Sequence, residues 1–505
     1  MKAARVLGII FAKAKECTIQ NGLTEILVSL TEAMRANAKE TKFKLYLLQA
    51  TGEIMVFIGI RDDFSIHHAA CKIIENLFFI SDKQSEKFAT TEVALSLWTI
   101  YNTVANNEHM RSSALAALCH MGLSYGDVLQ ALVDKVTIKG DMFQTSTPKV
   151  LQYFVTLLAI LAKKTKNRVL FIQDILPKMN ILYENTHVLT RAKAYTLTNI
   201  ILTTYNESIF ILAEAKLFQA YERDVRRTFP EKDENDLIHD SLNRLTTLLS
   251  TLFGTVIDEL LSGTEQTSAR KPSPVKDSFK RLLPYFRVLS IVIGNSCIRS
   301  RIVNLTSIKK LFKLMTNVKM IAELNIELTK SSSSLTEIIS CVSLTLDSLV
   351  RARELLNLFN EIIITDLLPL LNTYLSSTIN DFIVLSLCVL NELLNELQTN
   401  DCVLTKNLQL NIRNELLQAF LIQVDRLLLK EEPIPVITLH FIQTLVNLEQ
   451  IQCLDYIKKT KIIQNMFSLI TQHKEKTIGA LIQSTISCFN TMSEKANMIQ
   501  IMIEN

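Results

Sequence analysis

A chain of 505 residues, of which 48% are hydrophobic, is long enough to bury an extensive core. Its 11 glycines and 9 prolines are too few for the turns of a strand-rich fold, so the composition favours a nearly all-helical chain. The formal net charge of +4 is small for this length and excludes a strong global field toward nucleic acid or a membrane. We therefore expect neither kind of partner, and no uninterrupted apolar run approaches the ~18 residues of a membrane span.

Apolar residues recur at helical spacing along the whole chain. Between residues 65 and 121, three short amphipathic helices follow one another with breaks of a few polar residues, which predicts stacked helical repeats. Before this stretch the same pattern predicts helices over 23–38 and 42–60. After it, helices are predicted over 124–136, 150–162, 169–183, 189–203, 209–224, 237–261, 337–358, 361–376, 380–398, 405–430, 434–447, 452–471 and 476–490.

The clearest break in this pattern is a polar, basic stretch with no apolar periodicity. It divides the chain into a first repeat half over 1–262, an exposed basic linker loop over 263–277 and a second repeat half over 278–505. Within the loop, Ser273 precedes Pro274 and is flanked by basic residues, which makes it a candidate phosphorylation site; the alternative is an unmodified loop. The fold prediction is an all-α armadillo/HEAT-type solenoid, a right-handed superhelix of stacked helix pairs and triplets.

Several segments also carry a family resemblance. HHAACKIIEN (67–76), TEVALSLW (91–98) and SALAALCHM (113–121) resemble the armadillo-repeat region that follows the kinase domain in the Unc-51-like kinase four family, which includes the plant Runkel proteins and is related to the Fused kinases. Further segments of the same family follow in the same order, at 191–208, 215–230 and 427–446. The order of the segments along the chain carries the resemblance, because no single segment is a sharp motif.

The sequence contains no recognisable catalytic chemistry. A kinase needs a glycine-rich phosphate loop, a strand lysine, an HRD-type base and a metal-binding DFG, and none of these is present. The nine cysteines are scattered without a CxxC pair, and His67 and His68 would point about 100° apart on a helix, so neither set predicts a metal site. We therefore predict no catalytic residue, no cofactor and no metal, and a chain that is not an enzyme.

The resemblance implies a biological setting that the residues alone do not. It implies a protein-binding scaffold of the cytoplasm, associated with microtubules, the cytoskeleton and the cilium or flagellum, whose partners include Fused-type kinases and microtubule-associated proteins. Two alternatives stay open. One is a trafficking or nuclear-transport adaptor built on the same fold, and the other is a fragment of a longer serine/threonine kinase or pseudokinase whose catalytic head lies upstream.

Basic residues give the candidate partner-binding surface. Solenoids bind partners in a concave groove, and charge on its wall can attract an acidic partner. The candidates lie in neighbouring predicted repeats, and the alternative for both groups is an intrahelical ion-pair lattice or a solvated turn. They are Tyr221, Arg223, Arg226 and Arg227 at one helix end, and Lys163, Lys164 and Arg168 in the turn after another helix.

Overall fold

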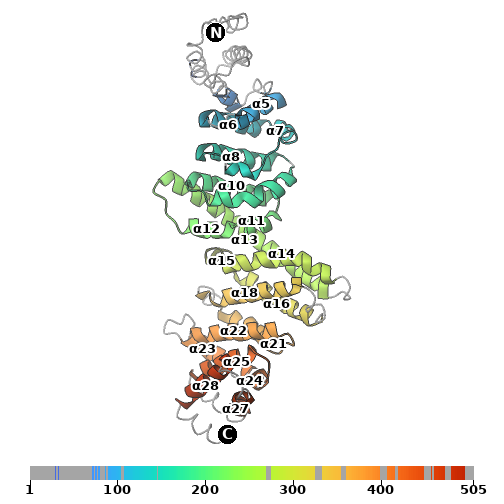
Figure 1. The fold of residues 1–505 in the computed structure, drawn as a ribbon, viewed down its shortest axis with the longest axis vertical. Helices are drawn as coiled ribbons and strands as arrows, with labels where there is room; N and C mark the ends of the chain where they lie inside the picture. Colours follow the sequence, from blue (N-terminus) through green and yellow to red (C-terminus); the bar gives the residue numbers. More distant parts are fainter. Residues whose placement is uncertain are drawn as a thin grey trace, which may run out of the picture. The chain divides into compact units, whose positions relative to one another are not determined.

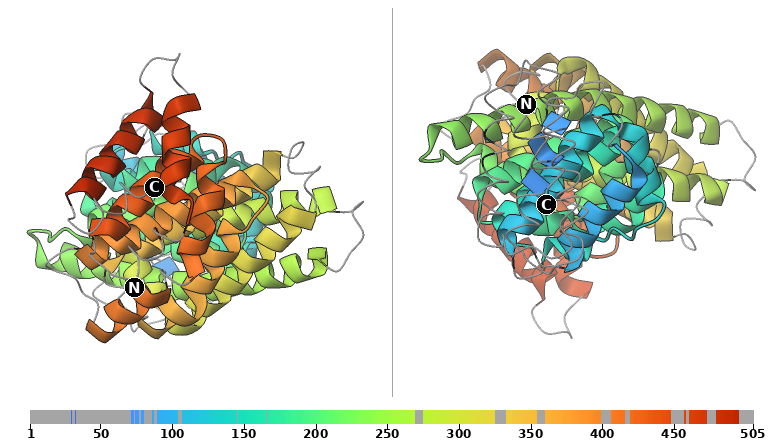
Figure 2. Two further views of the ribbon diagram at one scale, coloured as in Figure 1. Left: turned by 90° about the horizontal axis from the view of Figure 1, so that it is seen from below. Right: turned by 90° about the horizontal axis from the view of Figure 1, so that it is seen from above.

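The computed structural model describes most of the chain from residue 89 to residue 494. Before residue 89 it describes positions 29, 32, 71, 72, 74–76, 78, 79 and 86, and after that it omits 104–106, 145, 166, 269–274, 325–332, 354–359, 399–405, 416–418, 448–456, 458, 459, 473–478 and 495–505. Every regular element in the described residues is helical, as the views of Figures 1 and 2 show. This confirms the all-α prediction. The chain divides into two compact units, Met1–Leu248 and Leu249–Asn505.

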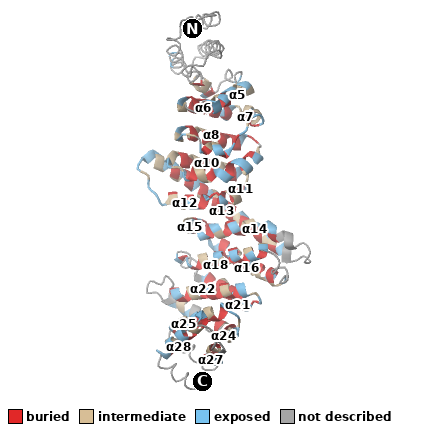
Figure 3. Ribbon diagram, viewed as in Figure 1, coloured by how far each residue is buried: buried red, intermediate tan, exposed pale blue. Residues whose placement is uncertain are grey.

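The helices of the first unit form two stacked layers (Figure 1). One layer follows chain order through α5 (Thr91–Thr103), α6 (Glu108–Ser124), α8 (Pro148–Lys164), α10 (Val188–Thr204) and the first part of α13 (Lys232–Ser268). The other contains α7 (Gly126–Val133), η2 (Gly140–Phe143), η3 (Leu170–Ile175), η4 (Leu176–Lys178), α9 (Met179–Tyr183), α11 (Ser208–Glu214) and α12 (Leu217–Val225). Buried residues line the helix sides that face their neighbours, and exposed residues lie on the outward sides (Figure 3).

Local sequence explains where the helices of the first unit begin and approach one another. The Asn107 side chain caps α6 by accepting a hydrogen bond from the Met110 backbone N–H at 3.0 Å. In α6 the buried residues Ala114, Ala116 and Ala117 have small side chains, so that α5 and α8 can pack closely against this helix. Trp98 and Tyr101 of α5 then pack against Phe154 of α8, with the Tyr101 and Phe154 rings stacked at 5.8 Å between centroids.

Two predicted helices of the first unit are interrupted in the structure. The helix predicted over 169–183 is a π-helical turn, a short 3-10 turn at Pro177 and then α9, because proline has no backbone N–H to continue an α-helical ladder. The helix predicted over 209–224 is divided at Lys216, whose backbone is left-handed with φ of 63°. The Lys216 ammonium group lies 3.1 Å from the Glu184 carboxylate. The break at Lys216 therefore separates α11 from α12.

The second unit has the same two-layer construction (Figure 1). One layer contains α14 (Val275–Gly294), α18 (Ser333–Val350), α22 (Asn380–Gln398), α25 (Ile434–Asn447) and α28 (Ala480–Ser493). The other layer contains the last part of α13, α15 (Ser296–Ile302), α16 (Leu305–Leu324), α20 (Asn360–Ile362), η5 (Ile363–Leu367), α21 (Leu368–Leu375), α23 (Lys406–Glu415), α24 (Leu421–Leu428) and α27 (Ile462–Gln472).

Polar bonds link successive helices of that second layer. Asn317 of α16 donates to the buried Thr264 hydroxyl of α13 at 3.2 Å, and the Tyr374 hydroxyl of α21 donates to the Met315 carbonyl of α16 at 3.0 Å. The Arg426 guanidinium of α24 continues the series to the Leu375 carbonyl of α21. Because a buried polar group without a partner costs free energy, these bonds favour one register between neighbouring helices.

The predicted linker loop is shorter than the sequence pattern indicated. The prediction placed a loop over 263–277, whereas α13 continues to Ser268 and α14 begins at Val275. Thr264, within the predicted exposed segment, is only 1% exposed because it packs against α16 and accepts the Asn317 hydrogen bond. Ser273 lies outside the described residues, so its phosphorylation stays a prediction.

Two helices are long and apolar enough to cross a membrane, judged by length and composition alone. They are Lys232–Gln266 and Ser333–Val350, with 39% and 50% of their most apolar windows buried. The sequence prediction considered only uninterrupted apolar runs and therefore did not identify them. A helix packed between neighbours in a repeat protein meets the same criteria, and Ser333–Val350 packs between α14 and α22.

Candidate functional site

The polar helix end that the sequence indicated is organised around one buried carboxylate. Asp224 of α12 is fully buried. One of its oxygens accepts hydrogen bonds from Arg191 Nε of α10 at 3.0 Å and from the Tyr195 hydroxyl at 2.9 Å. Arg223 adds two further bonds, from Nε and Nη2, each at 3.0 Å. The cluster therefore ties α12 to the first turns of α10.

The two arginines of this cluster have further partners. Arg191 is 6% exposed, and its Nη1 donates to the backbone carbonyls of Asn185 and Thr186 at 2.7 and 3.1 Å. Arg223 donates to the Tyr183 carbonyl at 2.5 Å, and its hydrogen bonds to Asp224 raise the pKa of its guanidinium. Burial, and then the Asp224 carboxylate, raise the pKa of the Tyr195 hydroxyl. The side chains of this cluster are hydrogen-bonded to Asp224 and to backbone carbonyls, which indicates a structural role.

This arrangement corrects two of the predicted partner-binding residues. Tyr221 is fully buried, and its hydroxyl is bonded to Thr246 of α13, so it cannot contact a partner in this structure. Arg223 is only 30% exposed, and its guanidinium is directed at Asp224 and away from a partner. The sequence could not show this, because an amphipathic helix end looks alike whether its charges meet solvent or a neighbouring helix. Arg226 pairs with Glu222 on the same helix at 2.6 Å, and Arg226 and Arg227 are exposed.

The two predicted basic groups do not form one surface. Lys163 and Lys164 are exposed in the last turn of α8, and Arg168, just beyond, pairs at 2.6 Å with Glu207, which follows the C-terminal end of α10. The other group lies beside Arg191, in the first turn of α10. From Arg191 to the end of α10 is about 20 Å along the helix axis. The exposed members stay candidates for two separate contacts.

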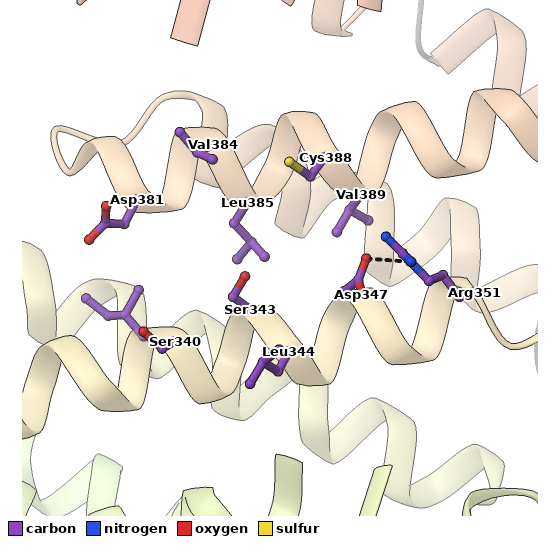
Figure 4. Close-up of a pocket in the computed structure, with 11 residues that line it drawn as sticks. Ser340, Ser343, Leu344, Asp347, Arg351, Asp381, Val384, Leu385, Cys388 and Val389 are labelled. Atoms are coloured by element: carbon purple, nitrogen blue, oxygen red, sulfur yellow. Dashed lines mark hydrogen bonds and ion pairs between the residues drawn. The ribbon is translucent and has the colours of Figure 1, made fainter. Parts of the chain in front are cut away.

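A surface hollow lies in the second unit, between α18 and α22 (Figure 4). It is an open groove of about 540 Å³. Leu344 of α18 and Val384 and Leu385 of α22 form the apolar part of its lining, and Leu385 points toward Ser343 of α18 (Figure 4). Leu344 is 59% exposed. Ile339, Ser340, Ser343, Asp347, Arg351, Asp381, Cys388 and Val389 complete the lining.

Charged residues lie at both ends of this groove. At one end Arg351 bonds to the Asp347 carboxylate at 2.9 Å and to Glu392 of α22 at 3.3 Å. At the other end is Asp381, in the first turn of α22, which forms no ion pair with any residue that the structure describes (Figure 4). Partial burial, and then the nearby Asp347 and Glu392 carboxylates, raise the pKa of the Cys388 thiol. The groove is therefore apolar at its centre and acidic in its surroundings.

Comparison with known proteins relates this region to a protein family. Residues 252–454, which include the whole groove, match the family model described as serine/threonine-protein kinase ULK4-like, HEAT repeats. The chain is also 22% identical to the mouse protein named serine/threonine-protein kinase ULK4, in an alignment that covers 100% of this chain. The chain contains a ULK4-like HEAT-repeat region. This confirms both the resemblance stated above and the α-solenoid fold class.

The chain spans 42% of the length of the mouse ULK4 protein. In the solved structures, it is similar to the crystal structure of an engineered protein, with a TM-score of 0.41, 12% identity, and coverage of 97% of this chain and 99% of that one. The ULK4-like sequence carries none of the kinase motifs sought above. Within the described residues, no three His, Cys, Asp or Glu side chains are grouped so that they could hold a metal ion.

The sequence analysis did not identify the groove in the ULK4-like region, although a local signal exists. On α18 the exposed or half-exposed residues Ser340, Leu344 and Asp347 follow each other at intervals of three or four, which places them on one helix face, and Arg351 follows directly after the helix. An exposed leucine in such a stripe marks a candidate contact. The signal does not show which helix lies beside it, so the groove becomes visible only in the structure.

Proposed function

We propose that this chain is a non-catalytic scaffold that binds other proteins through the exposed faces of its helical repeats. HEAT repeats generally mediate protein interactions, and stacked helices offer long surfaces for helices and extended segments of partners. The single observation that carries the proposal is the open groove between α18 and α22, inside the ULK4-like region. Its apolar centre and charged ends are the features of a protein-binding surface.

The proposal extends to the biological setting that the family implies. The scaffold works in the cytoplasm at microtubule-based structures, in particular the cilium or flagellum, and a Fused-type kinase is among its partners. The support for this setting is the match to a ULK4-like region and the order of resembling segments along the chain. The chain itself transfers no phosphate, in agreement with a sequence that has no kinase motif.

Three experiments test the proposal. A fluorescent fusion of the full chain is expressed in ciliated cells, where we expect it at the axoneme or the basal body; a uniform distribution with no ciliary signal contradicts the setting. The purified chain is titrated against a purified Fused-type kinase by calorimetry, with micromolar or tighter binding expected. The same preparation is titrated with ATP, and saturable micromolar binding of the nucleotide would contradict a purely non-catalytic scaffold.

A further inference from the structure

We propose that the groove between α18 and α22 binds one amphipathic helix of a partner protein, which places an apolar stripe on Leu344 and Val384 and a lysine or arginine beside Asp381. This inference rests on the proposed function, because it names the kind of partner segment that the scaffold takes. It makes the second unit, and not the basic residues of the first, the principal contact surface.

The backbone around the groove favours a helix as the occupant. Both walls are helices, whose backbone N–H and C=O groups are used within each helix, so the groove offers a partner few hydrogen-bonding groups besides the serine hydroxyls. An extended segment would lose the hydration of its own backbone without replacement, whereas a helix satisfies its backbone internally. From Ser340 to Arg351 the groove is about 16 Å long, which corresponds to about three helical turns.

The apolar centre supplies the attraction. Leu344 of α18 is exposed, and Val384, Leu385 and Val389 of α22 belong to the same lining (Figure 4). A single exposed leucine on a surface needs no explanation, but a leucine at the centre of an open hollow lined by further apolar side chains is the geometry that a partner's apolar side chain fills. An amphipathic helix presents such side chains on one face, at intervals of three and four residues.

The charges select a basic partner. Three carboxylates, those of Asp347, Asp381 and Glu392, lie around the groove against one guanidinium, that of Arg351. Arg351 is shared by Asp347 and Glu392, which leaves Asp381 at the far end as the carboxylate open to a partner's cation. Burial first, and then the Asp347 and Glu392 carboxylates, raise the pKa of the Cys388 thiol in the same groove. A helix with lysine or arginine next to its apolar stripe is complementary, and an acidic helix is repelled.

A displayed peptide library tests the inference on the full chain. The library encodes helices of three to four turns with randomised surface positions, together with an equal set of proline-containing, non-helical segments. It is selected on the wild-type chain with counter-selection on the Leu344→Glu variant. We expect enrichment of helices with apolar residues at i, i+3 or i+4, and i+7, flanked by lysine or arginine. Enrichment of the proline-containing or the acidic sequences, or no enrichment, would overturn the inference.

Charge reversal then tests the assigned contact. For a selected basic peptide, measured by fluorescence anisotropy, we expect Leu344→Glu to weaken binding at least about tenfold and Asp381→Lys to weaken it about three- to tenfold, with the second effect shrinking in high salt. The peptide with its cation changed to glutamate should recover binding to the Asp381→Lys variant. Matched controls are Leu429→Glu and Glu259→Lys, which change exposed residues of the other layer and should leave binding unchanged.

The outcomes separate this inference from the proposed function. Binding of the peptide that is equal in wild type, Leu344→Glu and Asp381→Lys refutes the groove assignment. If the titrated kinase still binds all three proteins, the scaffold function stands and only the groove inference falls. If light scattering shows a dimer of the wild-type chain that the Leu344→Glu variant lacks, the groove is occupied by a second copy and the inference is overturned as well. Circular dichroism melting of each variant confirms that folding is intact.

Discussion

The buried carboxylate of Asp224 allows a stringent test of how the first unit is held together. The change is Asp224→Ala, which removes the acceptor of three arginine N–H groups and of the Tyr195 hydroxyl. The charge of Arg191, which is 6% exposed, is then left without its counter-ion in the protein interior. We expect a large loss of stability because the uncompensated charge stays buried.

The magnitude follows from what the arginines retain. Removing one partner of a buried ion pair costs about 3–5 kcal/mol. Arg191 keeps two backbone carbonyls and its position over the Phe229 ring, 5.4 Å from the centroid, while Arg223 is 30% exposed and regains water. We therefore expect the lower end of the range, about 3 kcal/mol, which corresponds to a fall of about 1 M or more in the urea midpoint.

The assay is urea denaturation followed by far-ultraviolet circular dichroism, combined with hydrogen exchange resolved by peptide. Hydrogen exchange is needed because a long helical array need not unfold in one step, and the loss should be concentrated in α10 and α12. The matched control is Asp240→Ala. Asp240 also pairs with an arginine, Arg244 at 2.9 Å, but both side chains are exposed, so its removal should cost less than about 1 kcal/mol.

A double variant identifies the cause. If the cost of Asp224→Leu comes from an orphaned charge, adding Arg191→Met should restore part of the lost stability, since well-packed apolar side chains can replace a buried pair. The reasoning is refuted if Asp224→Ala is as mild as Asp240→Ala, or if the second substitution only adds a further loss. In either case an uncompensated buried charge would not be the cause of a loss of stability at the α10–α12 contact.

Three further predictions follow from the same structure. Gly140→Ala should lower the free energy of unfolding by about 1–3 kcal/mol, because the new Cβ would lie 2.5 Å from a backbone carbonyl oxygen. Gly254→Ala should raise it by about 0.5–1 kcal/mol, because this helical position has open space for the Cβ. The urea midpoints of the two variants measure both effects. Burial raises the pKa of the Cys119 thiol from 9.0 to about 12. Its contribution to stability is therefore complete below pH 9 and is lost as the pH rises toward 12, so the melting temperature should fall less steeply in Cys119→Ala. Arg223→Glu should lower the melting temperature by placing a second carboxylate beside a buried one, while the exposed Arg226→Glu should leave it nearly unchanged; equal melting of the two would contradict the buried cluster.

The sequence by itself determined that the chain is helical and where most helices lie. Apolar spacing and scarce glycine and proline are local properties, and they were sufficient for helices such as α8, α10, α22 and α25. Local signals were less reliable at the breaks. Pro177 was visible in the sequence but its effect on the ladder was not predicted, and the left-handed backbone at Lys216 carries no distinctive sequence mark.

Only the tertiary structure decided what the polar residues do. The sequence pattern assigned Tyr221 and Arg223 to a binding surface. In the structure Tyr221 is buried and bonded to Thr246 of α13, and Arg223 is bonded to Asp224, which also accepts a hydrogen bond from Arg191, 33 positions earlier in the chain. The α18–α22 groove likewise exists only because these two helices lie side by side. A helical pattern shows which residues share a face, but which face meets which neighbour depends on packing between distant segments.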